Sequence, residues 1–166
     1  MVTVPAALFL LFIVLQRTGE LFLARRNTRL LIRQGAVEVG ASHYPYMVAL
    51  HACWLLSLIL FGYGNPVIWP WLCLFVVLQV FRIWILLTLG ERWTTRIIIL
   101  DKPLVRSGPF GFVNHPNYML VVLEILVAPM VLGLFWVAVV FSILNAAMLA
   151  VRISVEERAL SHLRQS

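Results

Sequence analysis

Five apolar stretches, separated by shorter polar segments, dominate the pattern of hydrophobic and polar positions along the chain. Each is close to the roughly 20 residues that a helix needs to span the hydrocarbon core of a bilayer. They cover residues 3–23, 45–61, 67–89, 118–132 and 134–155. The pattern therefore predicts an all-α polytopic membrane protein, a bundle of five transmembrane helices that forms a single domain over residues 1–166.

The segments between the stretches refine this prediction. Glycine and proline at residues 62–66 predict a tight turn between the second and third helices. Little more than Gly133 separates the fourth and fifth, which should form a helical hairpin, and Pro129 should kink the fourth helix or mark its end. The first stretch lacks the basic region and cleavage site of a removable signal, so we expect a retained transmembrane helix.

Composition excludes a water-soluble domain. Apolar residues make up 62% of the chain and charged residues 12%, whereas soluble domains carry about 25% charged residues. The net charge of +6 comes from basic residues between the apolar stretches, so we attribute it to membrane topology and expect no nucleic-acid partner. Cys53 and Cys73 lie inside apolar stretches without metal-ligand spacing, which predicts packing residues and no metal site.

Basic residues mark one side of the predicted bundle. The two short turns on the opposite side carry neither lysine nor arginine. The basic side carries Arg25, Arg26, Arg29, Arg33, Arg92, Arg96, Lys102, Arg106, Arg158 and Arg164. The positive-inside rule therefore predicts an external N-terminus and a cytoplasmic C-terminus. The polar clusters at residues 38–45, 91–118 and 152–157 then face the cytoplasm, within reach of a cytosolic cofactor.

The predicted fifth helix carries a polar stripe. Asn145, Leu149, Arg152 and Glu156 follow one another at three- and four-residue steps and share one face. One interpretation is that Arg152 and Glu156 simply form an ion pair where the helix leaves the bilayer. The other is that the stripe points into the bundle, as ionisable groups in membranes usually do.

Charged residues inside the other helices have two interpretations. Glu20 with Arg82, or Glu124 with an arginine, would form ion pairs that only stabilise the bundle. Alternatively, these groups line a pocket that opens to the cytoplasm. His43 and His51, spaced for roughly one face of the second helix, are either interfacial residues or contacts for a substrate.

The segment before the fourth helix has the strongest chemical signal. Pro109 and Pro116 forbid a continuous helix, and Pro116 suits the first position of a new one. The free backbone N–H groups and the positive dipole end of that helix would suit a carboxylate or another anion. His115 and Tyr118 flank this point and can donate hydrogen bonds or stack on an aromatic ring.

These residues carry a resemblance to a known family. The matching elements are Gly108-Pro109-Phe110, His115-Pro116-Asn117-Tyr118, and Arg152 with Glu156-Glu157 and Leu160. Together they resemble the integral-membrane methyltransferases that include isoprenylcysteine carboxyl methyltransferase. The chain departs from that pattern at Asn114, where the family usually has an arginine.

The resemblance implies a cytoplasmic binding site for S-adenosylmethionine in the second half of the chain, residues 90–166. Glu156 and Glu157 would serve the ribose hydroxyls or the ammonium group of the cofactor. The implied cofactor-binding residues are Leu104, Val105, Gly108, Asn114, His115, Pro116, Tyr118, Glu156 and Glu157.

The N-terminal half is similar to a bacterial branch of that family, whose members resemble methylases of alkylpyrone or alkylresorcinol lipids. The similar elements are Glu20-Leu21, residues 24–27, residues 35–38, residues 43–45 and residues 91–96. This implies a bacterial inner-membrane location and a lipophilic or prenylated acceptor that enters from the bilayer. Glu38, His43 and Tyr44 are the implied substrate-binding residues.

Methyl transfer from a sulfonium requires alignment of nucleophile, methyl group and sulfur. A carboxylate acceptor needs only positioning, for which Arg82 and Arg152 are candidate catalytic residues. A phenol or enol acceptor benefits from a general base, for which His43, His51 and Glu124 are candidates. The sequence leaves open whether the product is an ester or an ether.

Two other classes of function are compatible with the sequence. One is a membrane reductase that binds a nicotinamide dinucleotide, although the chain has no Gly-x-Gly-x-x-Gly motif. The other is a small transporter subunit, which the charged residues inside the helices would suit. The chain shows no inverted repeat, and its polar groups gather on one side, which favours the methyltransferase.

Overall fold

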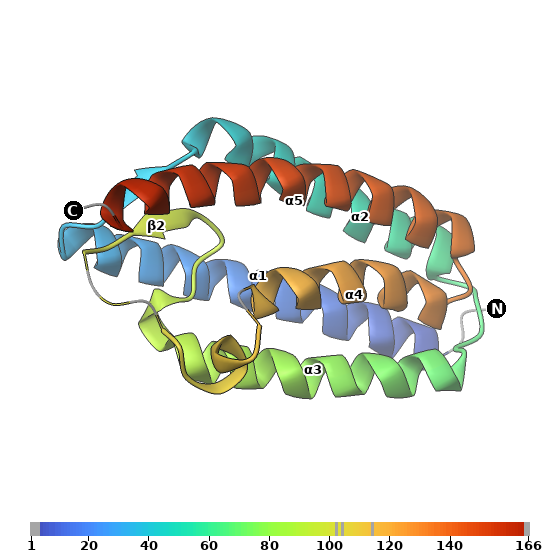
Figure 1. The fold of residues 1–166 in the computed structure, drawn as a ribbon. Helices are drawn as coiled ribbons and strands as arrows, with labels where there is room; N and C mark the ends of the chain where they lie inside the picture. Colours follow the sequence, from blue (N-terminus) through green and yellow to red (C-terminus); the bar gives the residue numbers. More distant parts are fainter. Residues whose placement is uncertain (1–3, 102, 104, 114, 165–166) are drawn as a thin grey trace.

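The computed structural model describes residues 4–101, 103, 105–113 and 115–164, with side chains as far as residue 159. Four long helices and one shorter helix lie alongside one another, as Figure 1 shows. They are α1 (Val4–Arg33), α2 (Tyr44–Gly62), α3 (Trp69–Leu89), α4 (Pro116–Val131) and α5 (Phe135–Arg164). Three short 3-10 turns complete the helical content, η1 (Ala41–His43), η2 (Gly90–Arg92) and η3 (Gly108–Gly111). The predicted all-α polytopic membrane fold is confirmed.

Four helical segments are long and apolar enough to cross a membrane. They are Val4–Arg33, Ala41–Gly62, Trp69–Arg92 and Phe135–Ala159. The fourth helix of the bundle is shorter than a full span, because its 16 residues extend about 24 Å against a hydrocarbon core of about 30 Å. It begins part-way along the bundle, and the described residues that precede it, which include η3, run beside the remaining length (Figure 1).

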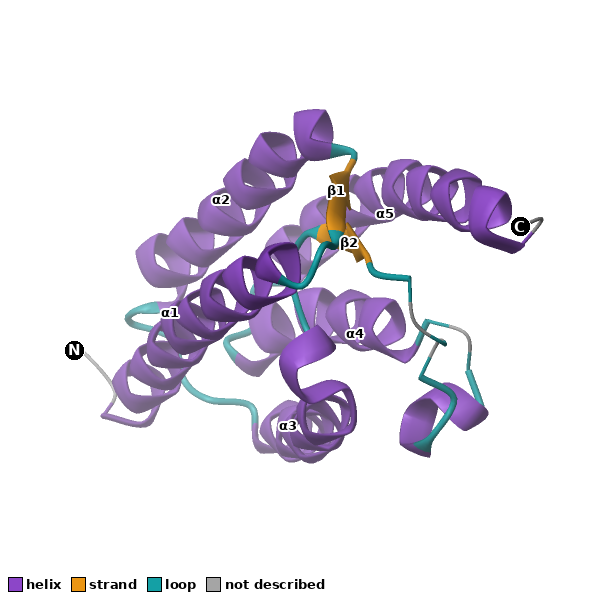
Figure 2. Cartoon of the chain, turned by 90° about the vertical axis from the view of Figure 1, so that its left-hand side faces the viewer, coloured by secondary structure: helices purple, strands orange, loops and turns teal. Residues whose placement is uncertain are grey.

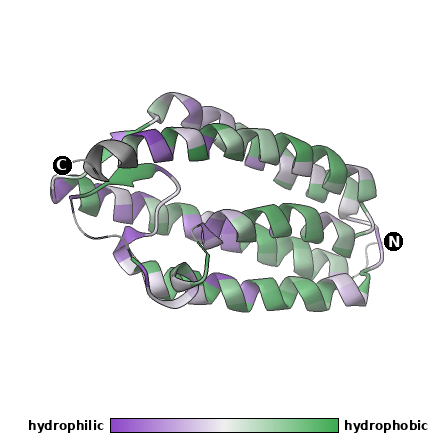
Figure 3. Ribbon diagram, viewed as in Figure 1, coloured by the Kyte–Doolittle hydropathy of each residue, from purple (hydrophilic) through white to green (hydrophobic). Residues whose placement is uncertain are grey.

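Two helices extend beyond the ends that hydropathy predicts. The first continues to Arg33, so that Arg25, Arg26 and Arg29 lie in its last turns and not in a loop. The fifth continues to Arg164. Arginine, glutamate and leucine favour helix about as well as one another, so the helix continues where the apolar stretch ends. Hydrophilic residues gather toward the end of the bundle that carries the C-terminus (Figure 3).

A two-stranded antiparallel sheet joins two loops at that same end. β1 (Val37–Val39) follows α1, and β2 (Ile97–Ile99) follows α3, with Val37 opposite Ile99. The all-α prediction contains no such sheet. Arg96 Nη1 lies 2.6 Å from Glu38 Oε1, which fastens the pair across the strands. Figure 2 shows that the sheet closes the end of the bundle between α1 and α5.

The short helix α4 is the centre of the bundle. It packs against both α3 and α5, and half of its residues are buried. Leu120, Ile125 and Val131 of α4 have no exposed surface and meet buried side chains of the other helices, such as Trp54 and Ile85. Large apolar side chains on the outer faces stay exposed, as expected of helices in contact with lipid.

A buried ion cluster ties α4 to α1 and α3. The Glu124 carboxylate, with no exposed surface, accepts hydrogen bonds from Arg17 Nη2 at 2.8 Å, Arg82 Nε at 2.7 Å and Gln79 Nε2 at 3.0 Å. Arg82 Nη1 also donates to Glu20 Oε1 at 2.7 Å. Both predicted pairings therefore form. The two arginines balance the two glutamates, which is the condition under which buried charges are tolerated.

We predict that Glu124→Ala destabilises the protein by about 3–5 kcal/mol, because Arg17 and Arg82 are left as buried charges without their shared partner. Unfolding of the detergent-solubilised protein by sodium dodecyl sulfate, followed by tryptophan fluorescence, measures this loss. Glu91→Ala is the matched control, because Glu91 is exposed in η2. Equal stability of the two variants would contradict a structural role for the cluster.

Candidate functional site

Two cavities adjoin inside the described part of the bundle. The inner cavity, of about 290 Å³, lies among the helices and has a mainly apolar lining from α1, α2, α4 and α5. The loop cavity, of about 1020 Å³, lies at the sheet end and is lined by β2, the chain between residues 105 and 115, and the ends of α3 and α5. Five residues line both cavities, and we call them the junction: Trp93, Thr94, Asn117, Tyr118 and Arg152.

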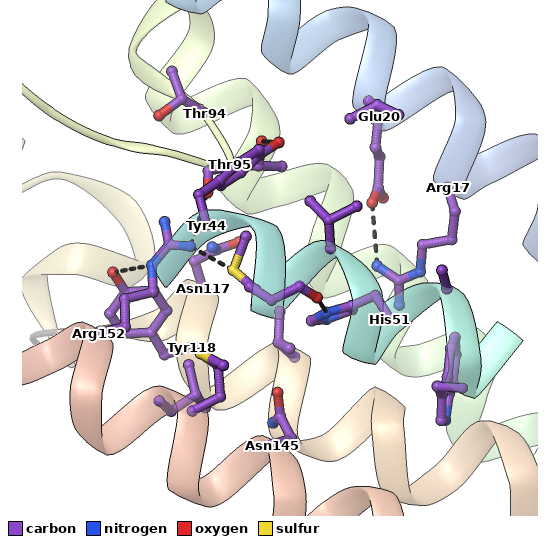
Figure 4. Close-up of a pocket in the computed structure, with 18 of the residues that line it drawn as sticks. Arg17, Glu20, Tyr44, His51, Thr94, Thr95, Asn117, Tyr118, Asn145 and Arg152 are labelled. Atoms are coloured by element: carbon purple, nitrogen blue, oxygen red, sulfur yellow. Dashed lines mark hydrogen bonds and ion pairs between the residues drawn. The ribbon is translucent and has the colours of Figure 1, made fainter. Parts of the chain in front are cut away.

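Arg152 of α5 organises the junction. Its Nε donates to the Tyr118 hydroxyl at 2.9 Å, and its Nη1 donates to the carbonyl of Thr95 at 2.8 Å and contacts the Met47 sulfur (Figure 4). The Tyr118 hydroxyl in turn donates to the Glu156 carboxylate. These bonds leave Nη2 as the part of the Arg152 guanidinium that is available to a ligand.

The charge of Arg152 has no direct counter-ion among the residues that the structure describes. Its link to Glu156 runs through the Tyr118 hydroxyl, so the direct pair that one interpretation of the sequence favoured does not form. Arg152 is 6% exposed, and a buried cation without a counter-ion attracts an anion or a further hydrogen-bond acceptor.

The start of α4 positions the aromatic part of the site. Pro116 occupies the first turn, and His115 stacks on Tyr118 with ring centroids 5.3 Å apart and an interplanar angle of 13°. The backbone amides of Tyr118 and Met119 both donate to the His115 carbonyl at 3.1 Å. The helix terminus therefore offers fewer free N–H groups for an anion than the sequence suggests.

The polar stripe of α5 faces both cavities. Asn145 lines the inner cavity, Arg152 lies at the junction, and Glu156 and Glu157 line the loop cavity. Of the two interpretations of the stripe, this arrangement favours the one in which Asn145, Arg152 and Glu156 point inward; Glu157 was not part of the stripe and is exposed. The stripe connects the apolar interior of the bundle to its polar end.

The residues implied in cofactor binding separate into three groups. Val105, His115, Tyr118, Glu156 and Glu157 line the loop cavity. Gly108 and Pro116 do not line the loop cavity but shape the backbone next to it. Leu104 and Asn114 lie outside the described residues.

Gly108 holds the loop close to α3. Its φ of 56° is in the left-handed region that favours glycine, and a Cβ at this position would lie 2.8 Å from Thr88 Oγ1. Any larger side chain would push the loop away from α3 and disturb the wall of the loop cavity.

Some of the predicted catalytic and substrate-binding residues line the inner cavity and others do not. Tyr44, His51 and Arg82 line the inner cavity. Glu38 is paired with Arg96 in the sheet, and His43 belongs to η1, beside the cavity lining. Glu124 is enclosed by its ion cluster and reaches neither cavity.

The segment after α3 contains two site residues, Trp93 and Thr94, to which no role was assigned from the sequence. Trp93 and Thr94 line both cavities, and Trp93 Nε1 donates to Asn117 Oδ1 at 3.4 Å. Asn27 of α1, 2% exposed, holds this segment by donating to the carbonyls of Gly90 at 3.1 Å and Trp93 at 2.9 Å. The sequence carried no signal of this contact, because Asn27 follows the first apolar stretch among arginines, and only the structure shows that it is buried.

Comparison with known proteins identifies the family. The sequence model of the isoprenylcysteine carboxyl methyltransferase family matches residues 71–162, more than half of the chain. The chain belongs to this family. The match runs from the start of α3 into the last turns of α5 and contains all five junction residues. Membership makes the protein a membrane methyltransferase.

Two relatives match nearly the whole chain. The protein is 39% identical over 160 residues to YpbQ of Bacillus subtilis (strain 168), an uncharacterized protein, with 92% of this chain and 95% of the relative covered. It is 29% identical over 159 residues to an uncharacterized protein of Haemophilus influenzae, with 89% and 90% covered. No solved structure matches the chain.

We predict that Tyr118→Phe lowers the free energy of unfolding by about 1–2 kcal/mol, because Arg152 and the Glu156 carboxylate lose their shared hydroxyl. Unfolding of the purified protein in sodium dodecyl sulfate measures the change. Tyr63→Phe is the control, because Tyr63 is 53% exposed at the end of α2. If both variants unfold at the same detergent concentration, the hydroxyl does not hold α4 to α5.

Proposed function

We propose that the protein transfers a methyl group from S-adenosylmethionine to a carboxylate or hydroxyl oxygen of a lipophilic acceptor. The observation that carries this proposal is the meeting, at five shared residues, of a mainly apolar cavity with a cavity whose lining is about half polar. A water-soluble donor and a lipid-soluble acceptor need sites of opposite polarity that meet where the group is transferred.

The loop cavity has the chemical groups that S-adenosylmethionine requires. Glu156 and Glu157 supply carboxylates for the ammonium and ribose hydroxyls, and Ile97 to Leu100 supply an apolar wall for the adenine. Arg92 and Arg106 line the same cavity and can hold the cofactor carboxylate, which compensates for Asn114 in place of the family arginine. The volume of about 1020 Å³ is at the upper end of the range typical for small-molecule sites.

The bound cofactor would supply an electrophilic methyl group on a sulfonium. The residues of the chain then have to orient the acceptor oxygen and exclude water from it. Arg152 Nη2 would bind that oxygen, and the bonds that its other nitrogens make to Tyr118 and Thr95 support this role because they leave Nη2 free. A carboxylate acceptor would bind the guanidinium directly and needs no proton transfer.

A hydroxyl acceptor has to lose a proton, and the junction offers a route for it. The Tyr118 oxygen donates its proton toward Glu156 and accepts one hydrogen bond from Arg152, so it can accept one more. As the acceptor hydroxyl gives its proton to the Tyr118 oxygen, the Tyr118 proton passes to the Glu156 carboxylate. In this proposal the relay through Tyr118 to Glu156 is the general base. Glu124 is not, because its carboxylate is already bound by three side chains.

We expect the purified protein to bind S-adenosylhomocysteine and to bind NADPH at least tenfold more weakly. Titration calorimetry in detergent measures both affinities, and labelled S-adenosylmethionine should transfer its methyl group into a bacterial lipid extract. Absence of S-adenosylhomocysteine binding at millimolar concentration would refute the proposed donor. Tight binding of NADPH alone would favour a membrane reductase.

Side-chain substitutions test the position of the donor site. Glu156→Gln and His115→Ala should each weaken S-adenosylhomocysteine binding by about 1–3 kcal/mol, the usual scale for a lost buried or charged hydrogen bond. Glu91→Gln is the control, because Glu91 has similar charge but lies outside the loop cavity. Unchanged affinity in both folded site variants would remove them from the binding site.

A further inference from the structure

The inner cavity contains two levels of polar residues. On α2, Tyr44 and His51 are seven residues apart, and on α5 Arg152 and Asn145 are also seven apart; all four line the cavity. Seven residues make about two helical turns, or roughly 10 Å along the axis, and return to the same face. Since α2 and α5 pack together in opposite directions, the two pairs lie at matching depths (Figure 1).

The first level consists of Tyr44 and Arg152, and hydrogen bonds to Thr95 hold both residues beside the junction. Tyr44 Oη lies 3.1 Å from Thr95 Oγ1, and Arg152 Nη1 donates to the carbonyl of the same threonine. We call His51, Asn145 and the neighbouring Arg17 the inner tier. In Figure 4 Arg152 and Tyr44 lie on one side of the cavity, and His51 and Arg17 lie on the other.

An apolar band separates the two levels. Met47 and Val48 of α2 and Met148 and Leu149 of α5 line the cavity between them. A ligand that reaches the inner tier from the junction therefore crosses a segment that is suited to a hydrocarbon chain. A hydrocarbon chain does not explain why the polar groups of the inner tier lie beyond this band.

The inner tier offers hydrogen-bonding groups without protein partners. Asn145 is 1% exposed, and its Nδ2 has no partner among the described residues; Arg17 Nε is also buried and unpartnered. His51 Nδ1 lies 2.9 Å from the Met47 carbonyl, which can only accept, so Nδ1 carries the proton of the neutral ring and Nε2 presents a lone pair. Buried polar groups are nearly always hydrogen-bonded, so the two buried unpartnered atoms, Asn145 Nδ2 and Arg17 Nε, indicate a ligand, and His51 Nε2 offers it an acceptor.

The charges around the inner tier are already balanced. Arg17 and Arg82 line the cavity with their guanidinium groups bound to Glu20 and Glu124, which gives the cluster no formal net charge. A second anion placed here would have no free cation to pair with. The missing partner is therefore an uncharged group, such as a ketone or hydroxyl oxygen.

We propose that the inner tier binds a second, uncharged oxygen group of the methyl acceptor, roughly 10 Å from the oxygen that binds Arg152. The proposal rests on the proposed function for the identity of the ligand as the acceptor. It assigns Asn145 as hydrogen-bond donor to the second oxygen and His51 Nε2 as the acceptor when that oxygen is a hydroxyl. A plain hydrocarbon tail would leave Asn145 without a partner, so the acceptor is not one whose buried part is hydrocarbon alone.

Keto isomers of hexadecanoic acid test this proposal. The carboxylate provides the group for Arg152, and in the distal isomer the ketone lies about nine bonds away, which matches the separation of the two levels. In the proximal isomer the ketone lies about three bonds away, within the apolar band. The two isomers have the same atoms and nearly the same hydrophobicity, so a difference in affinity reports position alone.

We expect the wild-type protein in lipid nanodiscs to bind the distal isomer about fivefold more tightly than the proximal isomer, the effect of one buried hydrogen bond. Asn145→Leu should abolish the preference, and Met148→Leu, a change within the apolar band, should preserve it. A third ligand carries a hydroxyl group in place of the distal ketone. His51→Phe should lower the affinity for this hydroxy acid and leave the affinity for the distal keto acid unchanged.

Equal affinity of the wild-type protein for the two isomers would overturn the proposal, as would a preference that survives in Asn145→Leu. Failure of both acids to bind would also overturn it, because the proposal requires the inner cavity to bind a chain that reaches from Arg152 to the inner tier. Binding of S-adenosylhomocysteine is measured in the same samples. If the wild-type protein does not bind S-adenosylhomocysteine, the proposed donor is refuted. If it binds S-adenosylhomocysteine but shows no preference between the two keto acids, only the proposed role of the inner tier is refuted.

Discussion

The helix α4 begins at Pro116, part-way along the bundle, and this late start creates the space that the loop cavity and the junction occupy. A backbone that is not helical survives at membrane depth only where protein covers it or where it lines a polar cavity. The chain between β2 and α4 meets this condition, because it forms one wall of the loop cavity and is held against α3 by the close contact of Gly108. A full-length fourth helix would fill the loop cavity and remove the junction.

The depth and rotation of α4 depend on Glu124. Hydrophobic contacts alone do not select one rotation of a helix within a bundle, because apolar side chains in lipid lose little by turning outward. A carboxylate that is bound by arginines from α1 and α3 permits one arrangement, since any other leaves a charge unpaired. Tyr118 lies six residues earlier on the same helix, so the cluster also fixes the residue that links Arg152 to Glu156.

The sequence predicts the helices and the α5 stripe because both depend on local periodicity. Apolar stretches define the five helices, and the spacing of Asn145, Arg152 and Glu156 defines one face. The positive-inside orientation stays a prediction. The ion cluster was one of two open interpretations, and the structure shows that the charges pair with one another while Arg17, Glu20 and Arg82 also line the inner cavity.

Features that join distant segments escaped the sequence. The β1–β2 sheet pairs strands of only three residues about sixty positions apart, and runs this short carry no periodic signal. The contact of Asn27 with the segment around Trp93 is equally non-local. Two of the five junction residues, Trp93 and Thr94, therefore became visible only when the segments that follow α1 and α3 were placed at one end of the bundle.

The two cavities differ in how much of their lining belongs to the matched family segment. Apart from Leu31, every residue that lines the loop cavity falls within residues 71–162. The inner cavity takes half of its lining from α1 and α2, including Arg17, Tyr44 and His51, which lie outside that segment. A donor common to a family of methyltransferases needs a common site, whereas acceptors that differ between members need walls that differ. The division of the lining supports a donor in the loop cavity and an acceptor in the inner cavity, with selectivity for the acceptor residing in the first two helices.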